Sequence, residues 1–175
     1  FARVRKEAGD TTITVKVYNN PKFPDEYEIS TPATFDSARQ LMLALNLSEK
    51  AVQETYREKW NIPSRPEIKE ITFDMVPGLP TYMEIEASTE SELNNFINEL
   101  GLDKTKIRNM PFSAQFTEYY GIPESHINNS TPLLTFADAN KYIKPTKNKA
   151  LFNSTIKKQR SELKIKSGSK SSLSS

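Results

Sequence analysis

Residues 70–86 read E-I-T-F-D-M-V-P-G-L-P-T-Y-M-E-I-E, and this stretch decides the expected fold. Polar and apolar residues alternate on both sides of the Pro-Gly-Leu-Pro sequence, which is typical of two consecutive strands joined by a turn. Alternate residues of a strand share a face, so Glu70 lies with Asp74, and Glu84 lies with Glu86. If the two strands pair, these carboxylates gather on one side of a small sheet. Facing like charges destabilise a sheet, so the cluster requires water, basic neighbours or a hard cation.

The rest of the chain predicts an α+β protein. Alternating or β-branched runs predict strands over residues 1–7, 11–18, 26–30, 52–62, 66–76 and 81–87. One helix is expected after Thr34, which suits an N-cap. A second helix is expected after Thr89, which forms a capping-box pattern with Glu92. This helix is expected to end at Gly101. Short aromatic stretches over residues 113–141 predict small packed helices. Six strands with short connections favour a meander, either a curved sheet or an antiparallel barrel.

Each expected strand has one charged or polar face and one apolar face. The charged faces carry Arg3, Arg5, Lys16, Glu26, Glu28, Arg57, Lys59, Glu70, Asp74, Glu84 and Glu86. One interpretation, and the more common structure, is a half-exposed antiparallel sheet with its charged face in water. The other is a closed barrel with the charges inside, where they must pair or bind ions, and helices outside. Periodicity alone does not distinguish the two.

Composition predicts one domain over residues 1–143 and a basic, partly helical and then disordered tail over 144–175. The chain from Lys141 onward has ten Lys or Arg residues and one acid, whereas residues 1–140 have fourteen bases and twenty-one acids. There is no cysteine, which excludes thiolate metal sites and thiol nucleophiles. No apolar run is long enough to cross a bilayer, and no secretory signal is present, so we expect a cytoplasmic protein with no membrane partner.

Several segments, taken in order, resemble the CYTH family, the triphosphate tunnel metalloenzymes that include class IV adenylate cyclases and thiamine triphosphatases. The segment I-T-F-D-x-x-P-G-L-P-x-Y-x-E-I-E-A within residues 70–91 is similar to the C-terminal strands of that family. Upstream, residues 3–5 match its R-x-R strand, 14–16 its T-x-K strand and 26–28 its E-x-E strand, while 54–60 resemble its K-x-R strand. The match covers residues 2–136, and the D-x(9)-E-I-E spacing is its most specific part.

The resemblance implies a tunnel formed by an antiparallel barrel that hydrolyses a triphosphate, either inorganic or carried by a nucleoside or thiamine. It implies phosphate binding by Arg3, Arg5, Lys16 and Arg57. Strand parity places Lys59 on the same face as Arg57, so Lys59 is expected to bind phosphate as well. It also implies that Asp74, Glu84 and Glu86 are the catalytic carboxylates and hold Mg²⁺ or Mn²⁺, with one ion neutralising the phosphates and another activating water. Glu26 and Glu28 are expected in the substrate site, first as ion-pair partners of the arginines and second as metal contacts.

Two departures from the family pattern keep other functions open. Nothing in this chain matches the family's opening E-x-E-x-K strand, so that strand is expected upstream of Phe1, and Thr55 stands where K-x-R has its first basic residue. The alternatives are a class IV-type adenylate cyclase, an inactive polyphosphate- or nucleotide-binding module and an RNA 5′-triphosphatase. A protein whose charged strands face water, with a structural or interaction role, is a further alternative. The basic tail suggests RNA as a partner, and we expect a monomer or homodimer.

Overall fold

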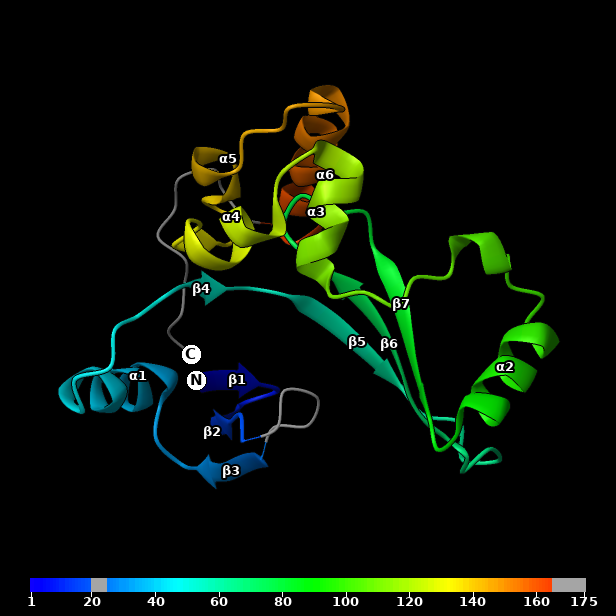
Figure 1. Cartoon of the computed structure of the whole chain (residues 1–175), viewed down its shortest axis with the longest axis horizontal. Coiled ribbons are helices and arrows are strands. Elements are labelled where there is room, and N and C mark those ends of the chain that lie inside the picture. Colours follow the sequence, from blue (N-terminus) through cyan, green and yellow to red (C-terminus); the bar gives the residue numbers. More distant parts are fainter. Residues whose placement is uncertain (20–24, 165–175) are drawn as a thin grey trace. The chain divides into compact units, whose positions relative to one another are not determined.

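The computed structural model describes residues 1–19 and 25–164. The chain is a mixed α+β protein, and its described strands form three sheets (Figure 1). It divides into two compact units, one formed by residues 1–49 and the other by the described residues from 50 onward. Each unit has its own antiparallel sheet and its own helices. Among the described residues, no helix has the length and apolar character needed to span a membrane.

The first unit is a three-stranded antiparallel sheet followed by one helix. Its elements are β1 (Ala2–Glu7), β2 (Asp10–Val17), β3 (Asp25–Thr31) and α1 (Phe35–Ala44), with β2 in the centre of the sheet. The Thr34 side chain accepts a hydrogen bond from the Ser37 N–H, which confirms the predicted N-cap. The three strands predicted from alternation are therefore present.

The second unit contains another three-stranded antiparallel sheet and a helix that packs against it. These elements are β5 (Tyr56–Trp60), β6 (Ile68–Met75), β7 (Tyr82–Ala87) and α2 (Glu90–Glu99), with β6 in the centre of the sheet. Ile68 and Ile71 of β6 pack with Phe96 of α2 in a small core. Thr89 caps α2 by accepting the Glu92 N–H, as the sequence predicts. The helix thus covers part of the sheet's apolar face, while Trp60 and Phe73 of the same face are exposed.

The second unit also contains a cluster of helices with a separate core. Its elements are η1 (Lys104–Lys106), α3 (Phe112–Tyr120), α4 (Glu124–Asn129), α5 (Ala139–Tyr142) and α6 (Lys149–Glu162), of which α3 to α6 group together in Figure 1. Tyr120 of α3 and Phe152 of α6 meet edge to face in this core, with ring centroids 5.3 Å apart. The turn between β6 and β7 contributes Val76 and Leu79 to the same core.

The strand predicted over residues 52–62 differs from the structure. The strand expected over 52–62 is two strands, β4 (Val52–Gln53) and β5, because β4 pairs in parallel with β8 (Leu133–Leu134) instead of continuing the antiparallel sheet. Glu54, at the break between β4 and β5, accepts a hydrogen bond from the Phe136 N–H at 2.9 Å. The six predicted strands therefore do not form one continuous meander.

The C-terminal region expected as a tail contains a core helix. Residues 149–162 form α6, and Phe152, Ile156 and Gln159 of this helix are buried. Burial of three side chains on one stripe makes α6 part of the second unit's core, although its composition is basic. Residues 165–175, the rest of the expected tail, lie outside the described residues.

Candidate functional site

The polar face of the β5–β6–β7 sheet brings together most of the predicted site residues of the second unit. In the observed register Arg57 lies opposite Asp74, while Thr72 lies between Lys59 and Glu84. Directly opposed residues in an antiparallel sheet point to the same face. The face consists of Arg57, Lys59, Glu70, Thr72, Asp74, Tyr82, Glu84 and Glu86. The gathering of carboxylates predicted from residues 70–86 is confirmed.

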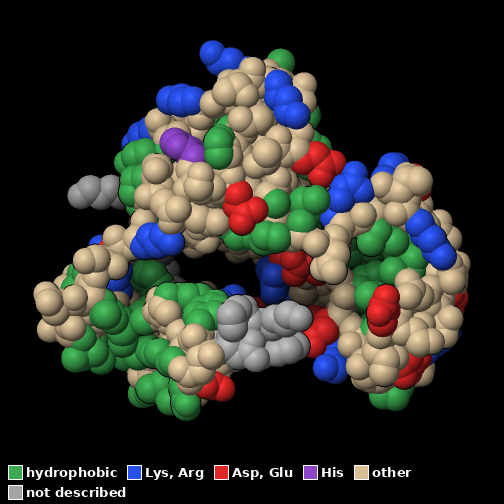
Figure 2. Space-filling view, in the orientation of Figure 1, with side chains coloured by type: hydrophobic (Ala, Val, Ile, Leu, Met, Phe, Trp, Pro, Cys, Tyr) green, Lys and Arg blue, Asp and Glu red, His purple; other side chains and the backbone are tan. Residues whose placement is uncertain are grey.

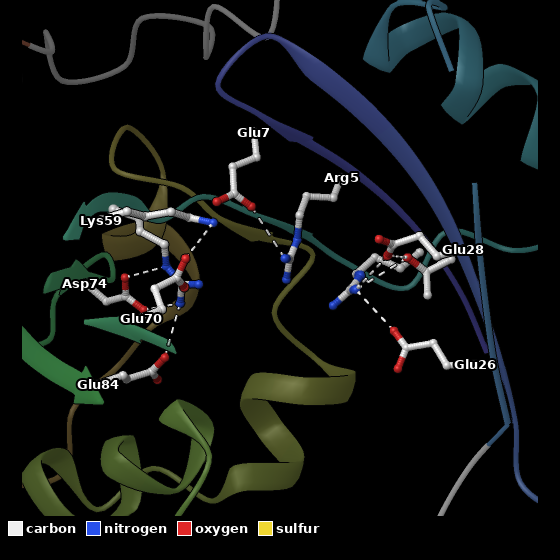
Figure 3. A network of polar contacts seen from close by, with 11 residues as sticks. Arg5, Glu7, Glu26, Glu28, Lys59, Glu70, Asp74 and Glu84 are labelled. Atoms are coloured by element: carbon white, nitrogen blue, oxygen red, sulfur yellow. Dashed lines mark hydrogen bonds and ion pairs between the residues drawn. The ribbon is translucent and has the colours of Figure 1, made fainter. Parts of the chain in front are cut away.

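Arg57 and Asp74 form the central ion pair of this face (Figure 3). The Arg57 Nε donates to Asp74 Oδ1 at 2.7 Å, and its Nη2 donates to Asp74 Oδ2, so both carboxylate oxygens are bound. The same Nη2 reaches Glu84 Oε2 at 3.2 Å. The Asp74 side chain is only 1% exposed, and a buried carboxylate is stable when a guanidinium pairs with it in this bidentate way.

The electrostatic environment of Glu84 differs from that of its neighbours. Burial raises the pKa of the Glu84 carboxyl above its usual value, the charge of Asp74 acts in the same direction, and Arg57 opposes both. Burial likewise raises the pKa of the Tyr82 hydroxyl, so this group stays protonated. Two carboxylates that share one arginine leave this part of the face with excess negative charge, and a bound cation would favour the ionised form of Glu84.

An open depression of about 280 Å³ lies on this face. It is lined by Arg57, Glu70, Thr72, Glu84, Ile85 and Glu86. The Oγ1 of Thr72 is buried, and no hydrogen-bond partner for it is found among the described residues. Buried hydroxyls are normally satisfied, so the Thr72 hydroxyl is an exception among the described residues that line this depression.

Two lysines of the same sheet form ion pairs with the other two carboxylates of the depression, those of Glu70 and Glu86. The Lys59 Nζ lies 3.3 Å from Glu70 Oε1, and the Lys69 Nζ lies 3.4 Å from Glu86 Oε1. Lys69 falls at an irregularity of the β6–β7 pairing between Ile68 and Glu70, so strand alternation does not place it near Glu86. Both pairs are largely exposed and therefore weak, which leaves Glu70 and Glu86 able to exchange partners.

The first unit has a charged sheet face of its own. The Lys16 Nζ lies 2.7 Å from Glu26 Oε2, and the Thr14 hydroxyl donates to Glu28 Oε2 at 2.6 Å. The Arg3 guanidinium lies 3.9 Å from Glu26 and 3.7 Å from Glu28, and these two glutamates are labelled in Figure 3. The hydrogen bond from Lys16 is the main reason that the pKa of Glu26 is lowered. The predicted pairing of these two glutamates with the arginines is confirmed for Arg3, and Glu26 has Lys16 as a further partner.

Two arginines of β1 retain hydrogen-bonding capacity. The Arg3 Nε is buried and has no acceptor within the described residues, and Arg5 makes a long ion pair with Glu7 at 3.5 Å. A guanidinium has five N–H donors in a planar fork that matches phosphate oxygens. Arg3 and Arg5 are therefore suited to bind an anion in addition to their present partners.

The predicted metal ligands are not arranged as one ready-made centre. Within residues 1–19 and 25–164, no three His, Asp or Glu side chains converge closely enough to hold a metal ion. Both Asp74 oxygens are bound by Arg57, whereas Glu84 and Glu86 lie at alternate positions of β7 and are more than half exposed. Carboxylate oxygens of this kind are suitable ligands for Mg²⁺ or Mn²⁺. The structure thus fits Glu84 and Glu86 as metal ligands better than it fits Asp74.

Sequence reasoning missed two features of this site. Thr72 shares the parity of Glu70 and Asp74, but an ordinary strand threonine gives no signal that its hydroxyl is buried without a partner in the described part of the chain. The contact of Lys69 depends on a strand irregularity that no residue pattern marks. Compared with protein-family models, curated proteins and solved structures, the chain has no significant match.

Proposed function

We propose that this chain is a triphosphate tunnel domain that hydrolyses a triphosphate-containing substrate with the help of Mg²⁺ or Mn²⁺. The observation that supports this function is the sorting of charge on its two antiparallel sheets. Each sheet has a polar face on which arginine and lysine are held among carboxylates, as seen for Lys16 with Glu26 and for Arg57 with Asp74. A face with both signs can bind a polyanion together with its cation.

We further propose that the two sheets are walls of one antiparallel barrel, with their polar faces directed inward. The resemblance to the CYTH family supports this arrangement. A spin label on β2 and another on β6 would test it: a narrow distribution of short distances supports the barrel, and a broad distribution contradicts it.

The phosphates would be bound by the cationic side chains of these faces. Arg3 and Arg5 would donate paired hydrogen bonds, and Lys16 would act as a point charge. A pair of unit charges about 4 Å apart gains about 4 kcal/mol at an effective dielectric near 20, and desolvation offsets much of this gain. Arg57 and Lys59 would contribute from the second unit once a phosphate competes with Asp74 and Glu70 for them.

Glu84 and Glu86 would hold the cation. A divalent ion supplies compensation for the charge that develops on the transferred phosphoryl group. The chain's own contribution is to orient the substrate through its arginines and to keep Glu84 beside Arg57. The hydroxyl of Thr72, which lacks a partner among the described residues, would bind a phosphate oxygen or a water of the same site.

Phosphate release from tripolyphosphate and ATP in the presence of Mn²⁺ tests this function. We expect the Glu84→Ala variant to lose activity by at least about a hundredfold, and Arg3→Ala to weaken substrate binding. Arg39→Ala is the matched control, because Arg39 pairs with Glu49 beside α1 and belongs to neither polar face. Full activity of Glu84→Ala would contradict the proposal.

The products separate the alternative functions. A cyclase releases pyrophosphate and a cyclic nucleotide from ATP, whereas a hydrolase releases orthophosphate. Tight binding of tripolyphosphate in calorimetry without turnover indicates an inactive binding module. If neither binding nor turnover is observed, including when an E-x-E-x-K strand is added before Phe1, the remaining alternative is a structural or interaction protein whose charged faces point to water.

A further inference from the structure

The turn that joins the two carboxylate-bearing strands is buried. Residues 76–79 lie between β6, which carries Asp74, and β7, which carries Glu84, and Leu79 has no exposed surface. Buried backbone groups need hydrogen-bond partners, and a four-residue turn cannot provide all of them itself. The partners of this turn come from helices far along the chain.

Gln159 of α6 binds three backbone groups of this turn. Its side-chain Nε2 donates to Val76 O at 3.0 Å and to Leu79 O at 2.8 Å, and its Oε1 accepts from Gly78 N at 2.8 Å. The side chain is 3% exposed, so water does not replace these bonds. Two acceptors and one donor at one point require an amide group, and neither a carboxylate nor an aliphatic side chain can satisfy all three.

Two aromatic side chains complete the contact with Gly78. The Tyr120 hydroxyl donates to Gly78 O, and the Phe152 ring lies directly against the Gly78 backbone. Gly78 has a φ of +86°, a conformation that residues with a Cβ rarely adopt. The conformation of the turn is therefore determined by α3 and α6 as well as by its own sequence.

We propose that Gln159 is a positioning residue for the candidate site. By fixing the ends of β6 and β7, Gln159 keeps Asp74 in bidentate contact with Arg57. It also keeps Glu84 within hydrogen-bonding distance of the same guanidinium. The inference rests on the proposed hydrolase function for its catalytic consequence, but the contact itself is independent of that function. It assigns a role at the site to a residue of the basic C-terminal region, about 80 positions away from the turn.

Hydrogen exchange tests the contact without any assay of activity. In Gln159→Glu the side chain keeps its size and one acceptor but loses both donors, and Gln159→Met keeps packing without any hydrogen bond. We expect the amides of Gly78 and Leu79 to exchange at least about tenfold faster in both variants. Asn153→Ala, on the exposed side of the same helix, is the control and should leave exchange unchanged. Unchanged exchange in both Gln159 variants would overturn the proposal.

Steady-state kinetics tests the positioning role. If Gln159 orients the carboxylates, kcat per folded molecule should fall by about ten- to a hundredfold in the Gln159 variants. The KM for tripolyphosphate should change little, because this substrate is bound mainly by residues of β1 and β2. A purely structural role would lower the folded fraction and leave kcat per folded molecule at the wild-type value, which would refute positioning. If the wild-type protein does not hydrolyse triphosphates, the proposed function fails while the exchange experiment still decides the contact.

Discussion

Arg57 on β5 binds both carboxylate oxygens of Asp74 directly across the strand pair. This relationship changes the role of Asp74, which the sequence suggests as a metal ligand. A carboxylate that is 1% exposed and bound at both oxygens acts first as the partner that keeps a guanidinium in place. Arg57 also donates from Nη2 to Glu84 and lines the open depression.

Removing Asp74 should destabilise the second unit. Asp74→Ala removes the bidentate partner of the Arg57 guanidinium, and we expect the free energy of unfolding to fall by about 3 kcal/mol. Urea denaturation measures this change. Glu86→Ala is the control, because the exposed Glu86–Lys69 pair should cost about 1 kcal/mol or less. Equal losses in the two variants would show that Asp74 is not a structural partner of Arg57.

Adding one methyl group at Gly78 should strongly reduce the stability of the protein, because Phe152 lies against this residue. A Cβ on Gly78 would lie 2.3 Å from Phe152 Cε2, and φ is +86°. Gly78→Ala should therefore lose about 2–5 kcal/mol, from backbone strain and overpacking together. Gly9→Ala provides the matched control, since Gly9 has a φ of +97° but nothing within 4 Å of its Cβ position, and about 1 kcal/mol is expected. Thermal unfolding measures both variants: Gly9→Ala reports backbone strain alone, and Gly78→Ala reports strain together with the clash against Phe152.

Glu54 predicts a pH dependence of stability. Burial raises its pKa above the usual 4.5, the Phe136 N–H opposes this, and Asp138 adds to it. The folded protein therefore binds more protons than the unfolded chain above pH 4.5, and this group makes stability fall as pH rises through the folded pKa. Glu54→Gln keeps an acceptor for Phe136 N without the charge. Its stability relative to wild type should increase from pH 4 to pH 7.

Glu118 is the control, because its pKa is shifted in the direction opposite to that of Glu54. The hydrogen bond from Arg108 lowers the pKa of Glu118, so its stabilisation is present above 4.5 and is lost as pH falls through the folded pKa. Glu118→Gln should lose stability relative to wild type at pH 7 and approach it at acidic pH. Parallel pH profiles for the Glu54 and Glu118 variants would contradict one of the two assignments, and the sign of the common slope would show which.

We propose that the basic surface of the second unit's helices binds RNA. Figure 2 shows lysine and arginine side chains (blue) spread over this surface. Lys149 and Lys157 of α6 are exposed, whereas Arg160 is bound to the carbonyls of Phe136 and Ala137 at 2.6 and 2.9 Å. Deleting the whole region would also remove the buried side chains of α6, so point substitutions are the suitable test.

The double variant Lys149→Ser/Lys157→Ser should weaken RNA binding and reduce the salt dependence. For single-stranded RNA, the loss of two phosphate contacts should lower the slope of log K against log salt by about 1.4. Fluorescence anisotropy at several salt concentrations measures it. Lys6→Ser, at an exposed position of β1 in the first unit, should leave the slope unchanged. An unaltered affinity of the double variant would end the RNA proposal.

Local features of the fold were predictable because strand alternation and a short turn determine register. The Pro-Gly-Leu-Pro turn pairs β6 with β7 as expected, and a slip by one residue would move Glu84 and Glu86 to the apolar face. The caps Thr34 and Thr89 were equally accessible because each bonds within its own first turn. These features depend on residues close together in the sequence.

Features that depend on distant segments were not predictable. The parallel pairing of β4 with β8 joins segments about 80 residues apart, and no local pattern indicates it. The basic composition around α6 concealed a stripe of three buried residues. For Asp74, residue type alone fits a metal ligand as well as an arginine partner, and only the register decides that Arg57 stands opposite.

The dependence of the buried turn on α6 has a consequence for biosynthesis. The segment 76–79 leaves the ribosome long before Gln159, Tyr120 and Phe152 are all available to enclose it. Until translation reaches the end of α6, the β6–β7 hairpin exposes apolar surface and unsatisfied backbone groups, which is a state that aggregates or recruits chaperones. Nascent chains stalled before α6 should therefore be protease-sensitive at this hairpin, and completion of the last helix should abolish that sensitivity.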